Sequence, residues 1–139
     1  MTTFFVFGSL MDMDILSAVL GREVQDRDLR AARADGFKRV CISGVGYPAM
    51  LPSADASTDG VAVSNLSRQD VARLAAYEGS DYEERPIALR FADGSRLDAR
   101  YWHWIGKRAI LDAPWDFEGW RQTAKPRMLS AARAAARRA

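Results

Sequence analysis

The chain has 139 residues, of which 48% are hydrophobic, which is enough for one domain with a real core and short for two. It carries 20 Lys and Arg residues against 18 Asp and Glu residues, with a single cysteine, Cys41, and a single histidine, His103. These counts exclude an internal disulfide and argue against a zinc site. No apolar run reaches about 18 residues and the N-terminus lacks a secretory signal pattern, so we expect no membrane span and a reduced, cytoplasmic protein.

The first half of the chain alternates predicted strands and helices. A β-branched and aromatic run predicts a buried strand over Thr3–Phe7, and a helix is expected over about Met11–Leu20. Ser9 and Asp12 have the spacing of a capping box for that helix, and Gly21 is a plausible C-terminal stop.

The middle of the chain continues this alternation. After a charged stretch, a second strand is predicted over Gly36–Ser43, followed by a Gly/Pro loop over Gly44–Pro52. A third strand is expected over Gly60–Val63. Ser67–Asp70 then reads as a capping box that begins another helix, which ends before Gly79.

The second half begins with a hairpin and ends with a helical tail. Two strands, Arg85–Phe91 and Arg96–Trp104, are joined by a turn that contains Asp-Gly, a strong hairpin signal. The aromatic region Trp115–Trp120 is expected to pack back on the core, and Pro126 to break or begin the last helix. This order predicts an α+β fold with a mostly antiparallel or mixed sheet.

Positive charge is concentrated at the C-terminus. Residues 121–139 hold six basic residues and no acidic one, whereas residues 1–120 have a net charge of −4. We interpret residues 1–139 as a single domain whose basic Ala/Arg-rich helical tail, about 127–139, is a solvated helix. Contact with nucleic acid or an anionic membrane is the alternative, and it is less favoured because the last 19 residues contain no aromatic residue to stack on bases.

Glu78 is the strongest candidate for a catalytic residue. It continues the apolar face formed by Val71, Leu74 and Ala75, and it lies directly before Gly79 at the negative end of the helix dipole. Burial and the dipole both disfavour the charged form, so the pKa of this carboxyl is expected to rise. A proton-transfer catalyst near neutral pH needs such a group. The alternative is a glutamate that turns outward at the helix end or pairs with an arginine.

The turn Phe7-Gly8-Ser9-Leu10 is a second candidate, because it joins a strand to the start of a helix. The first amides of a helix have no internal partner and attract anions, and a glycine lets the backbone approach a ligand closely. A plain tight connection is the alternative. Such a turn combined with a carboxylate base suits a substrate that is held by its own carboxylate and supplies its own nucleophile.

Three motifs occur in a familiar order: Phe7-Gly8-Ser9-Leu10-Met11, Tyr47-Pro48-Ala49 and Tyr77-Glu78-Gly79-Ser80-Asp81-Tyr82. Together they resemble the γ-glutamylcyclotransferase-like (AIG2-like) family over about residues 3–101, and the region 115–120 is also similar. The resemblance implies a small mixed β-barrel flanked by helices, with the site at its mouth. It also implies release of 5-oxoproline from γ-glutamyl peptides or amines without metal or cofactor.

The resemblance assigns roles to individual residues. Glu78 is the acid/base, and Phe7, Gly8, Ser9 and Leu10 bind the glutamyl moiety through backbone amides. The chain departs from the family pattern in two places: Phe7 replaces the usual tyrosine, and Glu84 stands where an arginine is expected, with Arg85 next to it.

Three tyrosines are further substrate-binding candidates, with plain packing as the alternative for each. Tyr47 and Tyr82 are expected to wall the pocket. Tyr101 shares a strand face with Leu97, Ala99 and His103, from which it could reach the barrel interior and hydrogen-bond a substrate.

The preferred function is a γ-glutamyl cyclotransferase in which the α-amine of the substrate attacks its own γ-carbonyl, with Glu78 moving the proton. A γ-glutamyl amidase or acyltransferase on the same site is one alternative, and a non-catalytic small-molecule-binding protein is another. The expected partner is a small γ-glutamyl compound rather than a nucleic acid or a membrane, and the protein is expected to be a monomer or a homodimer.

Overall fold

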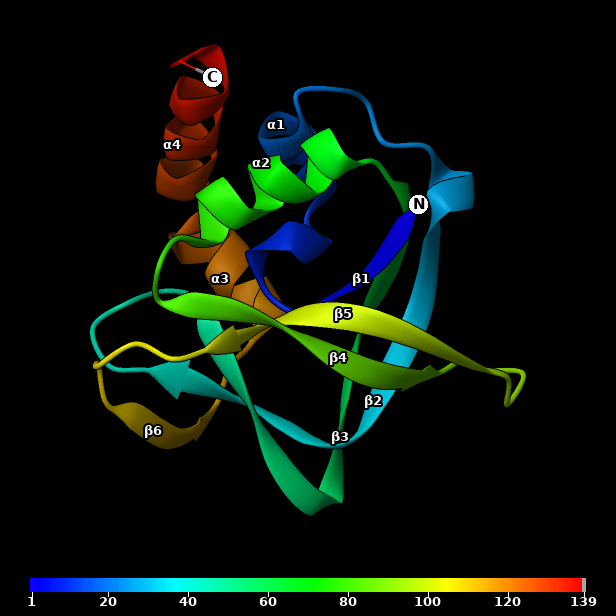
Figure 1. Ribbon diagram of the computed structural model, residues 1–139. Helices are drawn as coiled ribbons and strands as arrows, with labels where there is room; N and C mark the ends of the chain where they lie inside the picture. The colour runs from blue at the N-terminus through cyan, green and yellow to red at the C-terminus, as the bar shows by residue number, and fades with distance from the viewer. Residues whose placement is uncertain (139) are drawn as a thin grey trace.

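The computed structural model describes residues 1–138, which form a β-barrel with helices gathered against one side (Figure 1). The strands are β1 (Thr2–Val6), β2 (Leu29–Ile42), β3 (Pro48–Leu66), β4 (Tyr82–Arg90), β5 (Arg96–Trp104) and β6 (Ile110–Pro114). The α-helices are α1 (Met13–Leu20), α2 (Arg68–Glu78), α3 (Phe117–Thr123) and α4 (Lys125–Arg138), with short 3-10 turns at Ser9–Met11 and Asp26–Asp28.

The sheet closes on itself. Its strands follow the order β3-β1-β5-β4-β2-β6, and an additional pairing of β2 with β3 completes a barrel that leaves β6 as an extra strand. β1 and β5 are parallel, while the other pairs are antiparallel. The predicted mixed barrel flanked by helices is therefore confirmed.

The hairpin of β2 and β3 is much longer than its sequence indicates. It pairs from Leu29 with Val63 to Cys41 with Pro48, interrupted by a bulge near Gly36, whose φ is 80°. The prediction that β2 begins at Gly36 was wrong, as was the loop assigned to residues 48–52, which belong to β3. The charged stretch forms a strand because Ala32 and Ala34 face the barrel interior while Arg33 and Asp35 face water.

The β4–β5 hairpin matches its predicted sequence signal. Gly94 in the connecting turn has a φ of 85°, and the carboxylate of Asp93 accepts a hydrogen bond from the Ser95 N–H. Strand β6, which no sequence pattern indicated, pairs at Ile110 and Pro114 with the outer end of β2.

Two helix starts differ in how well the sequence predicted them. The capping box of Ser67 and Asp70 at the start of α2 is present as expected. The capping box proposed for Ser9 and Asp12 was wrong, because Asp12 itself caps α1 by accepting hydrogen bonds from two amides of its first turn. Ser9 instead begins a 3-10 turn, which leaves its hydroxyl free for another partner.

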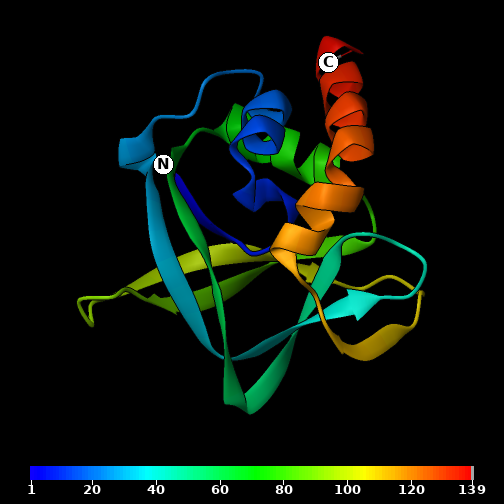
Figure 2. The ribbon, with the colours of Figure 1, turned by 180° about the vertical axis from the view of Figure 1, so that it is seen from behind.

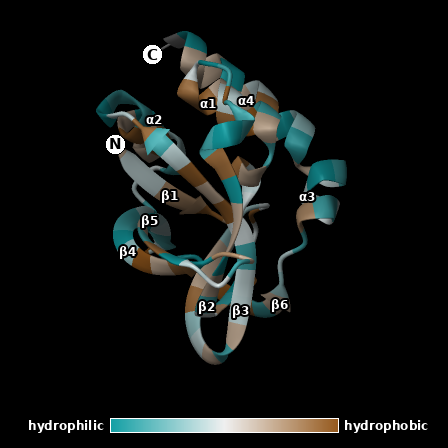
Figure 3. Ribbon diagram, turned by 90° about the vertical axis from the view of Figure 1, so that its right-hand side faces the viewer, coloured by the Kyte–Doolittle hydropathy of each residue, from teal (hydrophilic) through white to brown (hydrophobic). Residues whose placement is uncertain are grey.

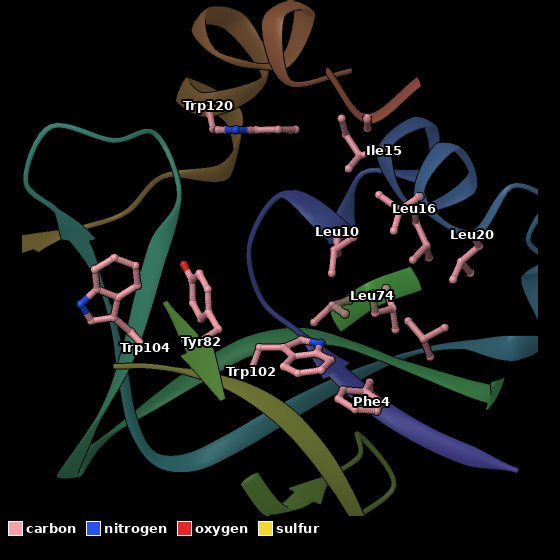
Figure 4. Close-up of a cluster of buried hydrophobic side chains, with 14 of the residues drawn as sticks. Phe4, Leu10, Ile15, Leu16, Leu20, Leu74, Tyr82, Trp102, Trp104 and Trp120 are labelled. Carbon is pink, nitrogen blue, oxygen red and sulfur yellow. The ribbon is translucent and has the colours of Figure 1, made fainter. Parts of the chain in front are cut away.

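Two hydrophobic clusters pack on opposite faces of the strands. One contains residues from strands and strand ends only, among them Phe5, Phe7 and Tyr101, and therefore fills the barrel interior. The other lies between the barrel and the helices, where Phe4 stacks under Trp102 at a ring-centroid distance of 5.1 Å (Figure 4). Trp120 is buried in this second cluster, so the C-terminal aromatic region packs back on the core as predicted.

The helices that cover the second cluster include the first and the last of the chain, which lie side by side (Figure 2). α4 lies beside α1, as the view from behind shows (Figure 2), and α1 carries a hydrophobic segment where the two run next to each other (Figure 3). Pro126 lies in the first turn of α4, where a proline needs no amide partner, so it begins the helix.

Candidate active site

Two adjoining cavities meet where the first strand, helix α2 and the loop before β3 come together. The inner chamber has a volume of about 30 Å³ and the outer chamber about 180 Å³. Both are bordered by Ser9, Tyr47, Glu78 and Tyr82. The inner chamber is completed by Phe5, Val6, Phe7, Gly8, Leu10, Pro48 and Trp102, and the outer chamber by Tyr77, Met128 and Ala131.

Glu78 lies at the boundary of the two chambers. It is the last residue of α2, one turn beyond the fully buried Leu74, and Gly79 ends the helix with a φ of 76°. Burial raises the pKa of the Glu78 carboxyl to about 8, and no neighbouring cation within the described chain lowers it. The expected rise in pKa is confirmed, and the alternative of an arginine-paired surface glutamate does not hold.

The turn Phe7–Leu10 borders the inner chamber with its backbone. The carbonyl of Gly8 accepts a hydrogen bond from the N–H of Met11 at 3.0 Å, which closes the 3-10 turn. Among the hydrogen bonds found within residues 1–138, none uses the N–H of Gly8, Ser9 or Leu10. These unpaired donors beside a cavity are suited to binding a carboxylate or a developing oxyanion.

Arg39 of β2 holds this turn from the other side. Its Nη1 donates to the carbonyl of Phe7 at 2.9 Å, and burial lowers the pKa of its guanidinium without removing the charge. Carbonyl and N–H point to opposite sides of a trans peptide, so this contact fixes the direction of the Gly8 N–H. The Pro48 ring lies 2.9 Å from where a Cβ on Gly8 would be, so the turn has no room for a side chain there. No sequence signal pointed to Arg39, because its contact with Phe7 depends on the closure of the barrel.

Tyr77 is a second residue that sequence reasoning missed. Its hydroxyl lies 2.8 Å from the Ser9 hydroxyl, so the pair ties the end of α2 to the turn. Burial raises the pKa of Tyr77 to about 12, so the phenol stays protonated, and either hydroxyl of the pair can be the donor. Its position directly before Glu78 in the third motif was the signal that could have identified it.

Tyr47 and Tyr82 both wall the site, as the sequence indicated. Their rings pack with Trp104, and Tyr82 contacts that indole edge-on at 5.3 Å (Figure 4). The Tyr82 hydroxyl donates to the carbonyl of Pro48 at 2.8 Å, and burial raises the pKa of this phenol. Tyr82 therefore holds the loop in place, while Tyr47 is half-buried and borders both chambers.

Tyr101 does not border either chamber. It lies in the barrel interior, where its ring packs near Phe7 and its hydroxyl contacts Nδ1 of His103 at 2.9 Å. The expected position in the barrel interior is confirmed, but the suggested contact of Tyr101 with substrate has no support in this geometry, because neither chamber reaches its side chain. Arg85 is also remote from the chambers and pairs with Glu83 on the outer surface.

Helix α4 forms part of the site wall, so its interpretation as a simply solvated tail was wrong. The buried carboxylate of Asp12 pairs with Nζ of Lys125 at 2.9 Å, and the same ammonium reaches Asp14 at 2.8 Å. The indole N–H of Trp120 donates to the sulfur of Met128 at 3.0 Å. These contacts hold α4 against the start of α1, so that Met128 covers the outer chamber.

Among residues 1–138, no group of three His, Cys, Asp or Glu side chains is arranged to hold a metal ion. Within the same range, no helix is long and apolar enough to cross a membrane.

Comparison with known proteins identifies relatives along almost the whole chain. It is 27% identical over 127 residues to AIG2-like protein A of Arabidopsis thaliana, covering 90% of this chain and 75% of that protein. It is 30% identical over 125 residues to AIG2-like protein D of the same plant, covering 88% and 80%.

Solved structures agree with these sequence relatives. The solution structure of At5g39720.1 from Arabidopsis thaliana matches with a TM-score of 0.70 and 27% identity, covering 94% of this chain and 87% of that one. A structure described as gamma-glutamyl cyclotransferase matches with a TM-score of 0.62 and 12% identity, covering 96% and 86%, which establishes a shared fold. Residues 4–122 match the family described as "Gamma-glutamyl cyclotransferase, AIG2-like". The chain therefore belongs to the AIG2-like gamma-glutamyl cyclotransferase family.

Proposed function

We propose that this protein is a γ-glutamyl cyclotransferase, an acyltransferase that releases 5-oxoproline from a γ-glutamyl amine or peptide. The observation that carries the proposal is Glu78, whose pKa burial raises to about 8 at the junction of two chambers. The unpaired amides of the Phe7–Leu10 turn border the same space. A reducing compartment such as the cytoplasm suits a chain whose one cysteine is free.

The turn would bind the substrate by its α-carboxylate. The inner chamber is the smaller of the two, and the free N–H groups at its border supply hydrogen bonds to a carboxylate. The γ-carbonyl then lies beside Glu78, and the α-amine of the same molecule can approach the carbonyl carbon. Holding the substrate in this conformation raises the effective molarity of its α-amine at the carbonyl carbon. This lowers the activation barrier by several kcal/mol.

One carboxyl group would serve both proton transfers. The Glu78 carboxylate accepts a proton from the α-amine as the new N–C bond forms, and a backbone amide stabilises the oxygen that gains charge. The same carboxyl, now protonated, gives its proton to the departing amine as the old C–N bond breaks. The products are 5-oxoproline and a free amine, and Glu78 returns to its starting form.

Measuring 5-oxoproline across γ-glutamyl amines, γ-glutamyl dipeptides and glutathione tests this proposal. We expect Glu78→Gln to lower kcat by about 100-fold or more while substrate binding, measured by calorimetry, is retained. Glu23→Gln, which changes an exposed glutamate, is the matched control and is expected to keep full activity. Undiminished lactam release by the Glu78 variant would show that this residue is not the acid/base. Free glutamate as the product would indicate an amidase, and tight binding without turnover would indicate a binding protein.

A further inference from the structure

We infer that Trp102 is a further substrate-binding residue, whose indole N–H donates a hydrogen bond to the α-carboxylate of the glutamyl head. This inference rests on the proposed cyclotransferase function and adds one side-chain donor to the backbone amides of the Phe7–Leu10 turn. It follows from the position of Trp102 at the inner chamber, from the missing partner of its N–H, and from the state of the other donors around it.

The indole of Trp102 is fixed in position beside the inner chamber. Trp102 lies in β5 and is only 7% exposed, and its ring stacks on Phe4 with an interplanar angle of 20°. The nitrogen lies on the edge of the ring that faces Leu10 and Leu74 (Figure 4). Both Trp102 and Leu10 border the inner chamber. Because a stacked ring in a close-packed core cannot turn over without displacing its neighbours, the N–H keeps this direction.

The N–H of Trp102 has no hydrogen-bond partner within residues 1–138, and it is buried from solvent. Nε1 of Trp104 and Nε of Arg39 are also buried without a partner, but neither residue borders either chamber. Buried tryptophan N–H groups usually have a partner, because an unpaired one has lost its water without replacement. Of these three donors, Trp102 is therefore the one that a ligand in the chamber can satisfy.

The other side-chain donors around the inner chamber are engaged or lie nearer to solvent. The Ser9 hydroxyl pairs with that of Tyr77, and the Tyr82 hydroxyl donates to a backbone carbonyl. Tyr47 is half-buried and borders both chambers, whereas Trp102 borders only the inner one. No cationic side chain is among the described residues that border this chamber, so a bound carboxylate depends on neutral donors.

The chemistry of this donor also orients the glutamyl head. An indole N–H donates a hydrogen bond and accepts none, so it suits a carboxylate and disfavours an ammonium group at the same place. The α-carboxylate is then held between Trp102 and the Phe7–Leu10 turn, and the α-amine is left on the side of the γ-carbonyl and Glu78. The same contact holds the carboxylate of the product, 5-oxoproline.

The indole resonances of the parent protein test this contact directly. The chain has four tryptophans, and sequential assignment identifies the side-chain N–H of each in a proton–nitrogen correlation spectrum. When 5-oxoproline is added, we expect the Trp102 proton to shift downfield, because its new partner is charged, while the Trp104 proton keeps its position. 2-Pyrrolidinone, the same lactam without the carboxylate, is expected to leave the Trp102 resonance in place.

The possible outcomes separate this inference from the proposed function. An unchanged Trp102 resonance at saturation with 5-oxoproline, or an equal shift with 2-pyrrolidinone, would overturn the inference and leave the cyclotransferase assignment intact. Absence of both 5-oxoproline binding and lactam release would instead overturn the proposed function and the inference with it. This measurement uses the parent protein and does not depend on the folding of any variant.

A matched pair of variants provides the second test. Trp102→Phe removes the N–H and keeps a ring to stack on Phe4, and we expect it to raise Kd for 5-oxoproline and KM for the γ-glutamyl substrate by about tenfold or more. We expect little change in kcat, because the carboxylate is held equally before and during the reaction. Trp104→Phe removes a buried, unpaired N–H that borders neither chamber, and is expected to keep both constants close to those of the parent. If the two variants raise KM equally, the effect is one of packing and the inference is wrong.

Discussion

The raised pKa of Glu78 predicts that the protein loses stability as the pH rises, and that Glu78→Gln removes part of this loss. In the unfolded chain the carboxyl ionises near its ordinary pKa of 4.5, whereas in the folded chain burial raises its pKa to about 8. Between these values the folded state binds more protons than the unfolded state, so the free energy of unfolding falls with rising pH. The loss begins above the unfolded pKa and is complete above the folded one.

The size of the effect follows from the same two values. Each pH unit in this window corresponds to about 1.4 kcal/mol, which gives an upper limit of about 5 kcal/mol between pH 4.5 and pH 8. Because Glu78 is only partly buried as a residue and borders a cavity, we expect about 2–4 kcal/mol. The Glu78→Gln variant has no titrating group at this position. The difference in the free energy of unfolding between this variant and the parent therefore grows by that amount as the pH rises.

Urea denaturation of both proteins at pH 5, 6.5 and 8 measures this difference. Other groups that titrate in the range, such as His103, are present in both proteins and largely cancel. The control Glu23→Gln is expected to show no pH-dependent difference, because it changes an exposed glutamate. A constant difference between the Glu78 variant and the parent across this range would refute the reasoning, because it would mean that the folded state solvates the carboxylate as well as water does.

Two further predictions concern the turn that borders the inner chamber. Gly8→Ala would bring a methyl group within 2.9 Å of the Pro48 ring, so we expect a loss of about 1–3 kcal/mol in the free energy of unfolding and a raised KM, measured by urea denaturation and steady-state kinetics. Parent-like stability and KM would contradict the tight contact. Arg39→Met removes the donor to the Phe7 carbonyl, and we expect a fall of about tenfold in kcat/KM that Arg39→Lys partly restores. If the lysine variant is no more active than the methionine variant at equal stability, the contact with Phe7 does not position the amide.

Local sequence patterns correctly predicted the elements whose structure depends on near neighbours. The capping box at Ser67 and Asp70 and the glycine after Glu78 define α2, in which the predicted apolar face buries Leu74 and brings Glu78, one turn later, to the cavities. The Asp-Gly turn defines the β4–β5 hairpin. The three family motifs predicted the mixed barrel and the placement of Glu78 near the Phe7–Leu10 turn. Their order identifies the family, and with it the fold, where no local pattern predicts how the strands pair.

Only the tertiary structure decided the features that depend on residues far apart in the chain. Tyr101 lies in the barrel interior as expected, but only the tertiary structure shows that neither chamber reaches it. The contact of Arg39 with Phe7, and the ion pair that fixes α4 through Asp12 and Lys125, join segments that no periodicity connects. The periodicity of apolar residues indicates which side of a helix or strand is buried. It does not indicate which other element packs against that side. The composition of the outer chamber therefore emerges only when the C-terminal helix packs against the first.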